Sequence, residues 1–129
     1  LCEQWTQINV LPNVPLVHGF CFGITRETIQ RIGFFDEKSF PKGYGEENDY
    51  CFRATDSGIG LVIATHTYIF HAKSKSYNRA DRLTYMKSGM DKFFEKYGNA
   101  RIERAVKTMQ RNPLLVRIRD LTNKIYTRA

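Results

Sequence analysis

The residues best suited to chemistry are three carboxylates that follow a glycine-rich turn. Glu46, Glu47 and Asp49 come directly after Gly-Tyr-Gly in the run KGYGEENDYCFR, which spans residues 42–53. Crowding three carboxylates raises the cost of ionising all of them unless amides, cations or a metal offset the charge. A carboxylate that is held beside a flexible loop and faces a cleft is suited to act as a general base. The plainer alternative is an acidic first turn that only favours the positive end of a helix dipole.

Helical spacing assigns these carboxylates different surroundings. On a helix over residues 46–57, Glu46, Asp49 and Arg53 share one stripe, so Asp49 and Arg53 can pair. Glu47 lies about 100° around the same helix and faces elsewhere. The pattern therefore predicts one carboxylate that is free to act and neighbours that are structurally tied.

The elements that would position this segment are predicted as a mixture of strands and helices. Residues 19–25 read as a buried strand, because they are rich in aromatic and β-favouring residues. A short helix follows over residues 26–32, and Thr25 and Gly33 cap its two ends. One or two short strands are predicted over residues 61–70. The expected fold class is α/β, with a short mixed sheet and flanking helices.

The second half of the chain is predicted to be a helical tail. Three amphipathic helices are expected, and their apolar stripes are Leu83, Met86, Met90, Phe93 and Tyr97, then Ile102, Ala105, Val106 and Met109, then Leu114, Ile118, Leu121 and Ile125. Gly98 closes the first of these helices, and Asn112 with Pro113 starts the third. We expect a catalytic part over residues 1–78 and a basic tail over residues 79–129 packed on it.

Charge and cysteine content limit the classes of partner and compartment. The chain carries a net charge of +7. Residues 1–72 hold five Lys or Arg against eight Asp or Glu, whereas residues 73–129 hold fifteen against five. This asymmetry favours an anionic partner for the second half, although a solvated basic surface is an equally good explanation. Three widely spaced cysteines (Cys2, Cys21 and Cys51) indicate reduced thiols in a cytoplasmic or cytosol-facing protein.

The run from His18 to Arg53 resembles the family-2 glycosyltransferases of the GT-A type and the related galactosyltransferase C-terminal region. The resemblance covers roughly residues 15–78 and rests on an ordered series of motifs. These are Gly19 with Arg26, then Gly33-Phe34-Phe35-Asp36-Glu37, then Gly43-Tyr44-Gly45-Glu46-Glu47-Asn48-Asp49, then Arg53, and finally Tyr68-Ile69-Phe70-His71. The resemblance implies an incomplete GT-A-like fragment, the acceptor-side half of an enzyme that transfers a sugar from a nucleotide-sugar donor to a glycan or lipid-linked acceptor.

The resemblance also implies roles for single residues. Glu47 matches the general base that deprotonates the acceptor hydroxyl with inversion at the sugar. Glu46, Tyr44 and Gly45 match the acceptor-binding positions, and Asp49 and Arg53 match the pair that braces the loop and helix. His71 matches a ligand of Mn²⁺ or Mg²⁺ on the donor diphosphate. Lys73, Lys75 and Ser76 follow it in a charged segment that is suited to close over the diphosphate as a lid, although a solvated basic linker is the plainer alternative.

One departure from the family limits these expectations. The chain contains no DxD aspartate pair and no glycine-rich phosphate loop, and only 18 residues precede Gly19. The chain alone is therefore expected to catalyse poorly or not at all. An exposed edge of the predicted sheet would favour self-association.

Two other classes of function compete with sugar transfer. A non-catalytic carbohydrate-binding remnant would use Trp5, Phe40, Tyr44 and the acidic loop to hold a glycan. Nucleic-acid binding through the basic tail is not expected, because no nucleic-acid-binding module is recognisable. The tail is expected to pack on the catalytic part or to rest peripherally on an anionic membrane at the cytosolic face.

Overall fold

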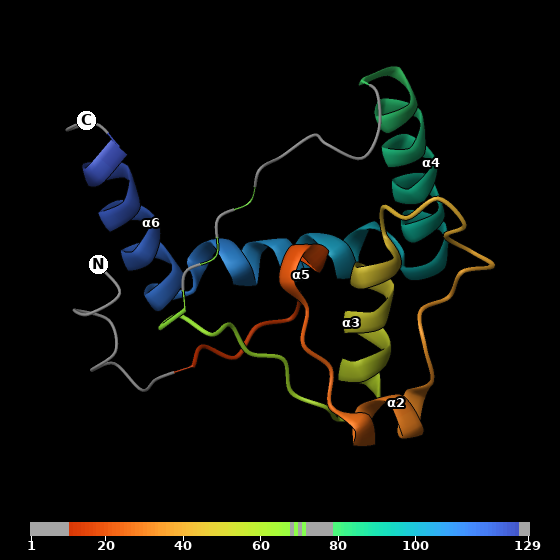
Figure 1. Ribbon diagram of the computed structural model, residues 1–129, viewed down its shortest axis with the longest axis horizontal. Helices are drawn as coiled ribbons and strands as arrows, with labels where there is room; N and C mark the ends of the chain where they lie inside the picture. The colour runs from red at the N-terminus through yellow and green to blue at the C-terminus, as the bar shows by residue number, and fades with distance from the viewer. Residues whose placement is uncertain (1–10, 68, 70, 72–78, 127–129) are drawn as a thin grey trace.

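A computed structural model of the chain describes residues 11–67, 69, 71 and 79–126. This part contains five α-helices and one short 3₁₀ turn. In chain order they are η1 (Gly19–Cys21), α2 (Arg26–Ile32), α3 (Glu46–Asp56), α4 (Arg79–Tyr97), α5 (Asn99–Arg111) and α6 (Pro113–Tyr126). Each α-helix packs on the next one along the chain, and α5 runs across the middle of the molecule between α4 and α6 (Figure 1).

The expected α/β fold is wrong for the described residues, which form helices, turns and irregular segments but no strand or sheet. Residues 19–25 begin with the turn η1 instead of a strand. In the region predicted to hold paired strands, the described residues make only one bridge, an antiparallel one between Asn13 and Val62. The GT-A-like sheet, and the sheet edge from which self-association was expected, are therefore not present in the part that the structure describes.

The reason is the lack of backbone partners for these extended segments. The bridge consists of two hydrogen bonds, from Val14 N to Leu61 O at 2.9 Å and from Ile63 N to Pro12 O at 3.2 Å. Pro12 lacks the N–H that would donate back to Ile63, and Pro15 lacks the donor that a strand on the opposite side would need. β-favouring residues have side chains that fit a pleated surface. They do not form a strand unless the backbone also finds a partner to pair with.

A side chain also diverts the backbone at the start of the predicted strand. His18 Nδ1 accepts a hydrogen bond from Phe20 N at 3.1 Å, and this contact caps η1. Cys51 Sγ accepts another from Val17 N at 3.4 Å. The N–H groups of Phe20 and Val17, which a strand would use for pairing, thus donate to His18 and to Cys51 of α3 instead.

The predicted helices are present, and their ends follow the capping signals. Thr25 accepts a hydrogen bond from Thr28 N at the start of α2, and Gly33 ends this helix at a positive φ of 78°. Asn112 Oδ1 accepts from the backbone N–H groups of the next helix at 3.1 Å and 3.2 Å, directly before Pro113. These local signals are read correctly because they require no partner distant in sequence.

The hydrophobic core joins the two halves of the chain. One cluster contains Phe40 and Phe52 from the first half with Phe93, Ile102 and Ala105 from the second. The Phe52 and Phe93 ring centroids are 5.2 Å apart. The described residues on the two sides of position 78 therefore share a single core.

None of the helices in the described part of the chain has the length and apolar character that crossing a lipid bilayer requires.

Candidate functional site

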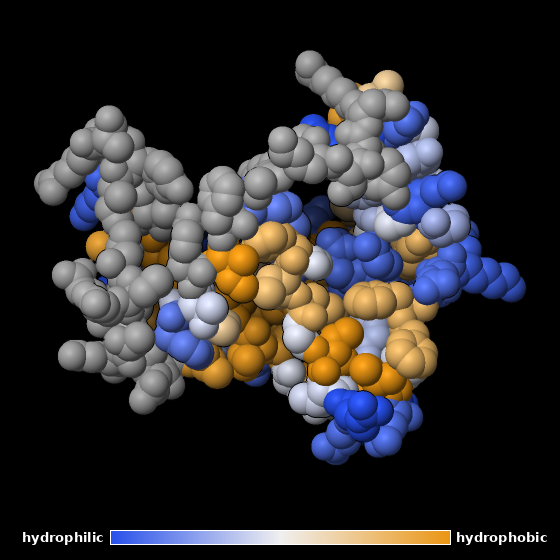
Figure 2. Space-filling model, in the orientation of Figure 1, coloured by the Kyte–Doolittle hydropathy of each residue, from blue (hydrophilic) through white to orange (hydrophobic). Residues whose placement is uncertain are grey.

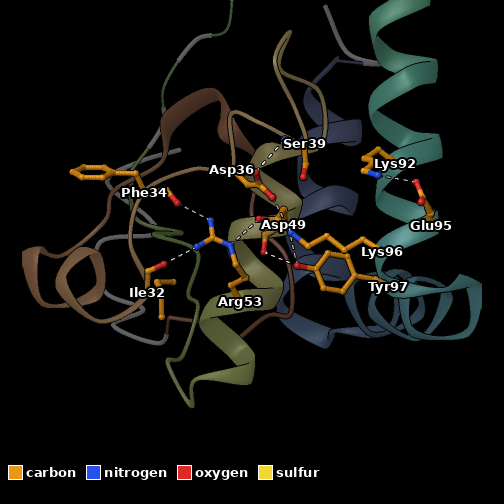
Figure 3. A network of polar contacts seen from close by, with 10 residues as sticks. All are labelled: Ile32, Phe34, Asp36, Ser39, Asp49, Arg53, Lys92, Glu95, Lys96 and Tyr97. Carbon is orange, nitrogen blue, oxygen red and sulfur yellow. Dashed lines mark hydrogen bonds and ion pairs between the residues drawn. The ribbon is translucent and has the colours of Figure 1, made fainter.

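The best-defined polar cluster surrounds Asp49, which is fully buried in α3. Its Oδ2 lies 2.8 Å from Arg53 Nε, and its Oδ1 lies 2.6 Å from Lys96 Nζ. Tyr97 donates its hydroxyl proton to the same Oδ1 at 2.7 Å. Figure 3 shows these side chains converging on Asp49 from α3 and α4. The pair of Asp49 and Arg53 expected from helical spacing thus forms, and α4 adds two more partners.

These contacts set the ionisation of the cluster. Burial acts to raise the pKa of Asp49, but the hydrogen bonds from Lys96, Arg53 and Tyr97 outweigh it and lower the pKa overall. Burial acts to lower the pKa of Lys96, whereas its hydrogen bonds to Asp49 and Asp36 raise it overall. The Tyr97 pKa rises because its hydroxyl is desolvated and donates to Asp49. Asp49 is therefore a structural anion and a poor proton acceptor at neutral pH.

Arg53 extends the cluster toward the loop after α2, which contains Phe34 and Phe35. Its two terminal nitrogens donate to Ile32 O and Phe34 O, each at 2.8 Å. The guanidinium also lies 4.8 Å above the Tyr50 ring centroid. Arg53 therefore fixes the end of α2 against α3, as a bracing residue would.

The turn before α3 is held in an unusual backbone conformation. Tyr44 has a φ of 60° and Gly45 a φ of 124°. A Cβ on Gly45 would lie 2.9 Å from an atom of the Phe40 ring, and a Cβ on Gly89 would overlap the Tyr44 carbonyl oxygen. Because Gly45 and Gly89 have no side chain, the backbone of α4 can lie in direct contact with the backbone of this turn. The turn is a tightly packed and defined element of the structure.

Glu46 is half-buried at the start of α3. Its Oε2 is shielded from solvent and has no hydrogen-bond partner among the described residues. Burial, together with the nearby charge of Glu47, raises the pKa of Glu46. A shielded carboxylate oxygen without a donor costs free energy until it gains a proton or a hydrogen-bond donor.

Glu47 extends from α3 toward Gly45 and Gly19, and its carboxyl group lies close enough to that of Glu46 to affect the pKa of Glu46. Its Oε2 accepts a hydrogen bond from Gly45 N at 3.3 Å, which is a long and weak contact. Its side chain lies against Gly19, where an added Cβ would come within 3.3 Å of it. The carboxylate of Glu47 therefore sits between the glycine turn and η1.

His71 lies on the same short turn from another direction. Its ring stacks on the Phe20 ring with centroids 4.0 Å apart, and it meets the His18 ring edge-on at 6.3 Å. His18, Gly19 and Phe20 are consecutive, so η1 brings His71 and Glu47 to the same short stretch of chain. The structure thus gathers two of the predicted functional residues that are 24 positions apart in sequence.

The described residues do not by themselves fit the expected metal site. No group of three or more His, Cys, Asp or Glu side chains in this part of the chain could hold an ion. His71 is one imidazole, whereas Mn²⁺ and Mg²⁺ prefer several oxygen ligands in addition. The described residues therefore offer His71 as a single possible ligand and not a complete site.

The remaining predictions fall partly outside the described residues. Lys73, Lys75 and Ser76, expected in a lid, lie outside them, as does Trp5. Phe40, expected to bind sugar in the alternative reading, is buried in the core instead.

Sequence reasoning missed the contribution of α4 to the site. Lys96 bridges Asp49 and Asp36, and its Nζ lies 3.1 Å from Asp36 Oδ2. Hydrogen bonds from Ser39 and Lys96 lower the pKa of Asp36. In the sequence, Lys96 and Tyr97 stand at the end of an apolar stripe. This position does not indicate that Lys96 pairs with Asp49, 47 residues away.

An apolar hollow of about 400 Å³ lies apart from these residues. Phe22, Ile24, Tyr50 and Leu61 contribute to its lining, and none of the predicted site residues does. Figure 2 shows apolar surface gathered below the centre of this face. The hollow is therefore a feature separate from the carboxylates at the start of α3.

Comparison of the chain with protein-family models, with curated proteins and with solved structures finds no match, so its likeness to glycosyltransferases rests on the motifs alone.

Proposed function

We propose that this chain supplies the acceptor side of a glycosyltransferase that moves a sugar from a nucleotide-sugar donor to a glycan or lipid-linked acceptor. The observation that carries the proposal is the position of Glu47. Among the described residues, Glu47 accepts one long hydrogen bond, from Gly45 N, and interacts with the carboxyl group of Glu46. The nearby Asp49, in contrast, is fully committed to Arg53, Lys96 and Tyr97. The start of α3 therefore separates an available base from a structural anion.

The chemistry requires one proton transfer and one displacement. Glu47 removes the proton of an acceptor hydroxyl, whose oxygen forms a bond to the anomeric carbon of the donor sugar. The bond from that carbon to the diphosphate oxygen breaks, and the nucleoside diphosphate leaves with the electron pair. Attack from the face opposite the leaving group inverts the anomeric centre. General-base catalysis of this kind contributes about 10²–10⁴-fold to a rate.

The neighbouring residues bind and position the acceptor in this proposal. The unsatisfied Oε2 of Glu46 accepts a hydrogen bond from a second acceptor hydroxyl. Asp49 and Arg53 act as positioning residues, because they fix α3 against α2 and α4 without reaching the reacting atoms.

The donor side of the proposed site involves His71. In this proposal His71 lies on the donor side, because its ring stacks on Phe20, the residue after the glycine against which Glu47 packs. A divalent ion would neutralise the diphosphate when bound, with ligands beyond those in the described residues. Cys21 and Cys51 are free thiols, which supports a cytosol-facing location.

The test is a donor-panel assay on the full-length gene product. We would measure nucleoside diphosphate released from a series of nucleotide sugars, with and without Mn²⁺ or Mg²⁺. Turnover is expected to fall at least a hundredfold in Glu47→Gln. The matched control is Glu27→Gln, an exposed first-turn carboxylate of α2, which should keep full turnover. Equal turnover in Glu47→Gln and wild type would refute the role of Glu47.

A specific observation also favours glycan binding without transfer. Phe34 is 75% exposed and Phe20 is 40% exposed, and exposed aromatic faces stack well on sugar rings. A chain that binds glycans but releases no nucleoside diphosphate from any donor would support this second function. Loss of glycan affinity in Phe34→Ala, with Phe35 left intact, would locate the sugar.

A further inference from the structure

The basic residues of the second half are not equivalent, because some already have structural partners. Arg101 pairs with Asp56 through two contacts of 2.6 Å and 3.2 Å, and its guanidinium lies 4.3 Å above the Phe52 ring centroid. Arg119 donates to the carbonyls of Met109 and Gln110, at the end of α5. These two arginines hold the helices together and are not available to an external anion.

Three other cations form a single exposed row on α5. Arg104, Lys107 and Arg111 occur at helical spacing i, i+3 and i+7, so they share one face. Arg104 and Arg111 are separated by roughly 10 Å along the helix axis. All three side chains are exposed. We call this row the α5 basic stripe.

The stripe faces away from the protein because the opposite side of α5 is buried. Ile102 and Ala105 lie in the hydrophobic core and fix the rotation of the helix. Among the described residues, Glu103 pairs with the stripe: its Oε2 lies 3.6 Å from Lys107 Nζ, with both side chains more than 60% exposed. A solvated pair of this length contributes little and leaves the stripe with a positive field.

The surroundings of the stripe indicate what kind of anion fits it. The cations line an open, shallow hollow of about 650 Å³ beside Ala100, Thr108 and Asn112. Glu103 also lines the hollow, and none of the lining residues is aromatic, so the hollow lacks the platforms on which nucleic-acid bases stack. A straight row of cations over small residues matches a flat array of phosphate charges, which all three side chains can meet together.

We propose that the α5 basic stripe docks the chain on an anionic phospholipid surface. The long-range field of residues 73–129, with fifteen basic and five acidic residues, draws the chain to such a surface, and the stripe sets its orientation. This docking does not depend on the proposed transferase activity.

Vesicle sedimentation tests the proposal on the chain as it is. Wild type should sediment with vesicles that contain phosphatidylglycerol at about 50 mM salt, and release should be nearly complete at about 300 mM. The triple variant Arg104→Gln, Lys107→Gln, Arg111→Gln should lose about a hundredfold in partition coefficient, since each surface cation contributes about fivefold. Vesicles of phosphatidylcholine alone should bind neither protein.

A second triple variant separates the stripe from net charge. Lys38→Gln, Lys87→Gln, Lys124→Gln removes three exposed cations from other surfaces and gives the same net charge. It should lose less than about tenfold, and circular dichroism should show that both variants stay helical. Equal losses in the two variants would overturn the proposal.

Two further arms identify other sources of the same negative charge. Displacement from vesicles by micromolar inorganic pyrophosphate would reassign the stripe to a soluble polyphosphate. Stripe-dependent binding to a single-stranded oligonucleotide, with no binding to vesicles, would reassign it to nucleic acid. Either result would contradict membrane docking, whatever the outcome of the donor-panel assay.

Discussion

Lys96 Nζ lies 2.6 Å from Asp49 Oδ1, and this ion pair joins α4 to α3, whose first turn carries the candidate base Glu47. The Asp49 side chain is completely excluded from solvent, whereas Lys96 is one-third exposed. Because Arg53 and Tyr97 hold the same carboxylate, the position of α3 depends on a single buried anion. Residues far from any substrate thus determine how Glu46 and Glu47 are presented.

Asp49→Asn should destabilise the fold strongly. The amide keeps the shape of the side chain but removes its charge, so Arg53 and Lys96 lose their anion. The amide NH₂ group, itself a donor, would also face the donors of its neighbours. Breaking a buried ion pair in this way costs about 3–5 kcal/mol. Urea unfolding followed by circular dichroism measures the loss. Glu103→Gln, which removes an exposed and loosely paired carboxylate, should change stability by less than about 0.5 kcal/mol.

The same carboxylate should make the fold acid-sensitive. The pKa of Asp49 is lowered below its ordinary value of 3.8, so its stabilising contribution is complete above that pH. The contribution is lost as the pH falls through the lower, folded-state value. Wild-type stability should therefore decline steeply below about pH 4, and the slope should be smaller in Asp49→Asn. Parallel slopes for the two proteins would show that other carboxylates control acid unfolding.

Gly89→Ala should disrupt the contact between α4 and the turn before α3. Alanine normally favours a helix by about 1 kcal/mol over glycine, so an increase in stability would be the simple expectation. At this position the added methyl would overlap the Tyr44 carbonyl oxygen, which belongs to the backbone and cannot rotate away. We expect a net loss of about 2 kcal/mol or more, measured by thermal unfolding. Gly60→Ala, where no atom lies within 4 Å of the added Cβ, should be nearly neutral.

Glu46→Gln should stabilise the fold and weaken its activity. The pKa of Glu46 is raised, so its ionisation above pH 4.5 opposes folding, and a neutral amide avoids that cost. The gain in melting temperature should be present at pH 7 and should shrink as the pH falls below 4.5, where the wild-type group is also protonated. In the donor-panel assay the KM for the acceptor should rise. Opposed changes in stability and activity are typical of a binding residue, whereas unchanged acceptor KM would limit Glu46 to a structural role.

The two described cysteines should differ sharply in reactivity. Burial raises the pKa of Cys51 to about 11, and its thiol contacts Val17 in the interior, whereas Cys21 is exposed. In a Cys2→Ser background, a thiol reagent at pH 8 should modify Cys21 rapidly and Cys51 only at the rate of unfolding. Rapid modification of both thiols in the folded protein would show that α3 separates readily from the segment around Val17.

The sequence predicted the local elements well and the long-range ones poorly. Thr25, Gly33, Gly98 and Asn112 marked helix ends because a cap acts on residues three or four positions away. The pair of Asp49 and Arg53 was predictable for the same reason. A strand at residues 19–25 was not formed because strands depend on partners elsewhere in the chain, and Pro12 and Pro15 limit those available.

The candidate site shows the same division between local and long-range information. Helical spacing placed Glu47 away from Asp49 correctly. The convergence of Lys96 and Tyr97 on Asp49 could not be inferred, because it joins residues almost 50 positions apart. The contacts of Glu47 with Gly19 and of His71 with Phe20 likewise depend on how the chain turns at His18, which composition did not indicate.

The shared core has a consequence for how the chain is made. Phe40 and Phe52 are synthesised early, but the cluster that buries them also needs Phe93, Ile102 and Ala105. During translation these early aromatic rings have no completed core until α5 has left the ribosome. The nascent chain therefore exposes these apolar rings for as long as the residues between α3 and α5 are being synthesised, and transiently exposed apolar surface of this kind favours aggregation.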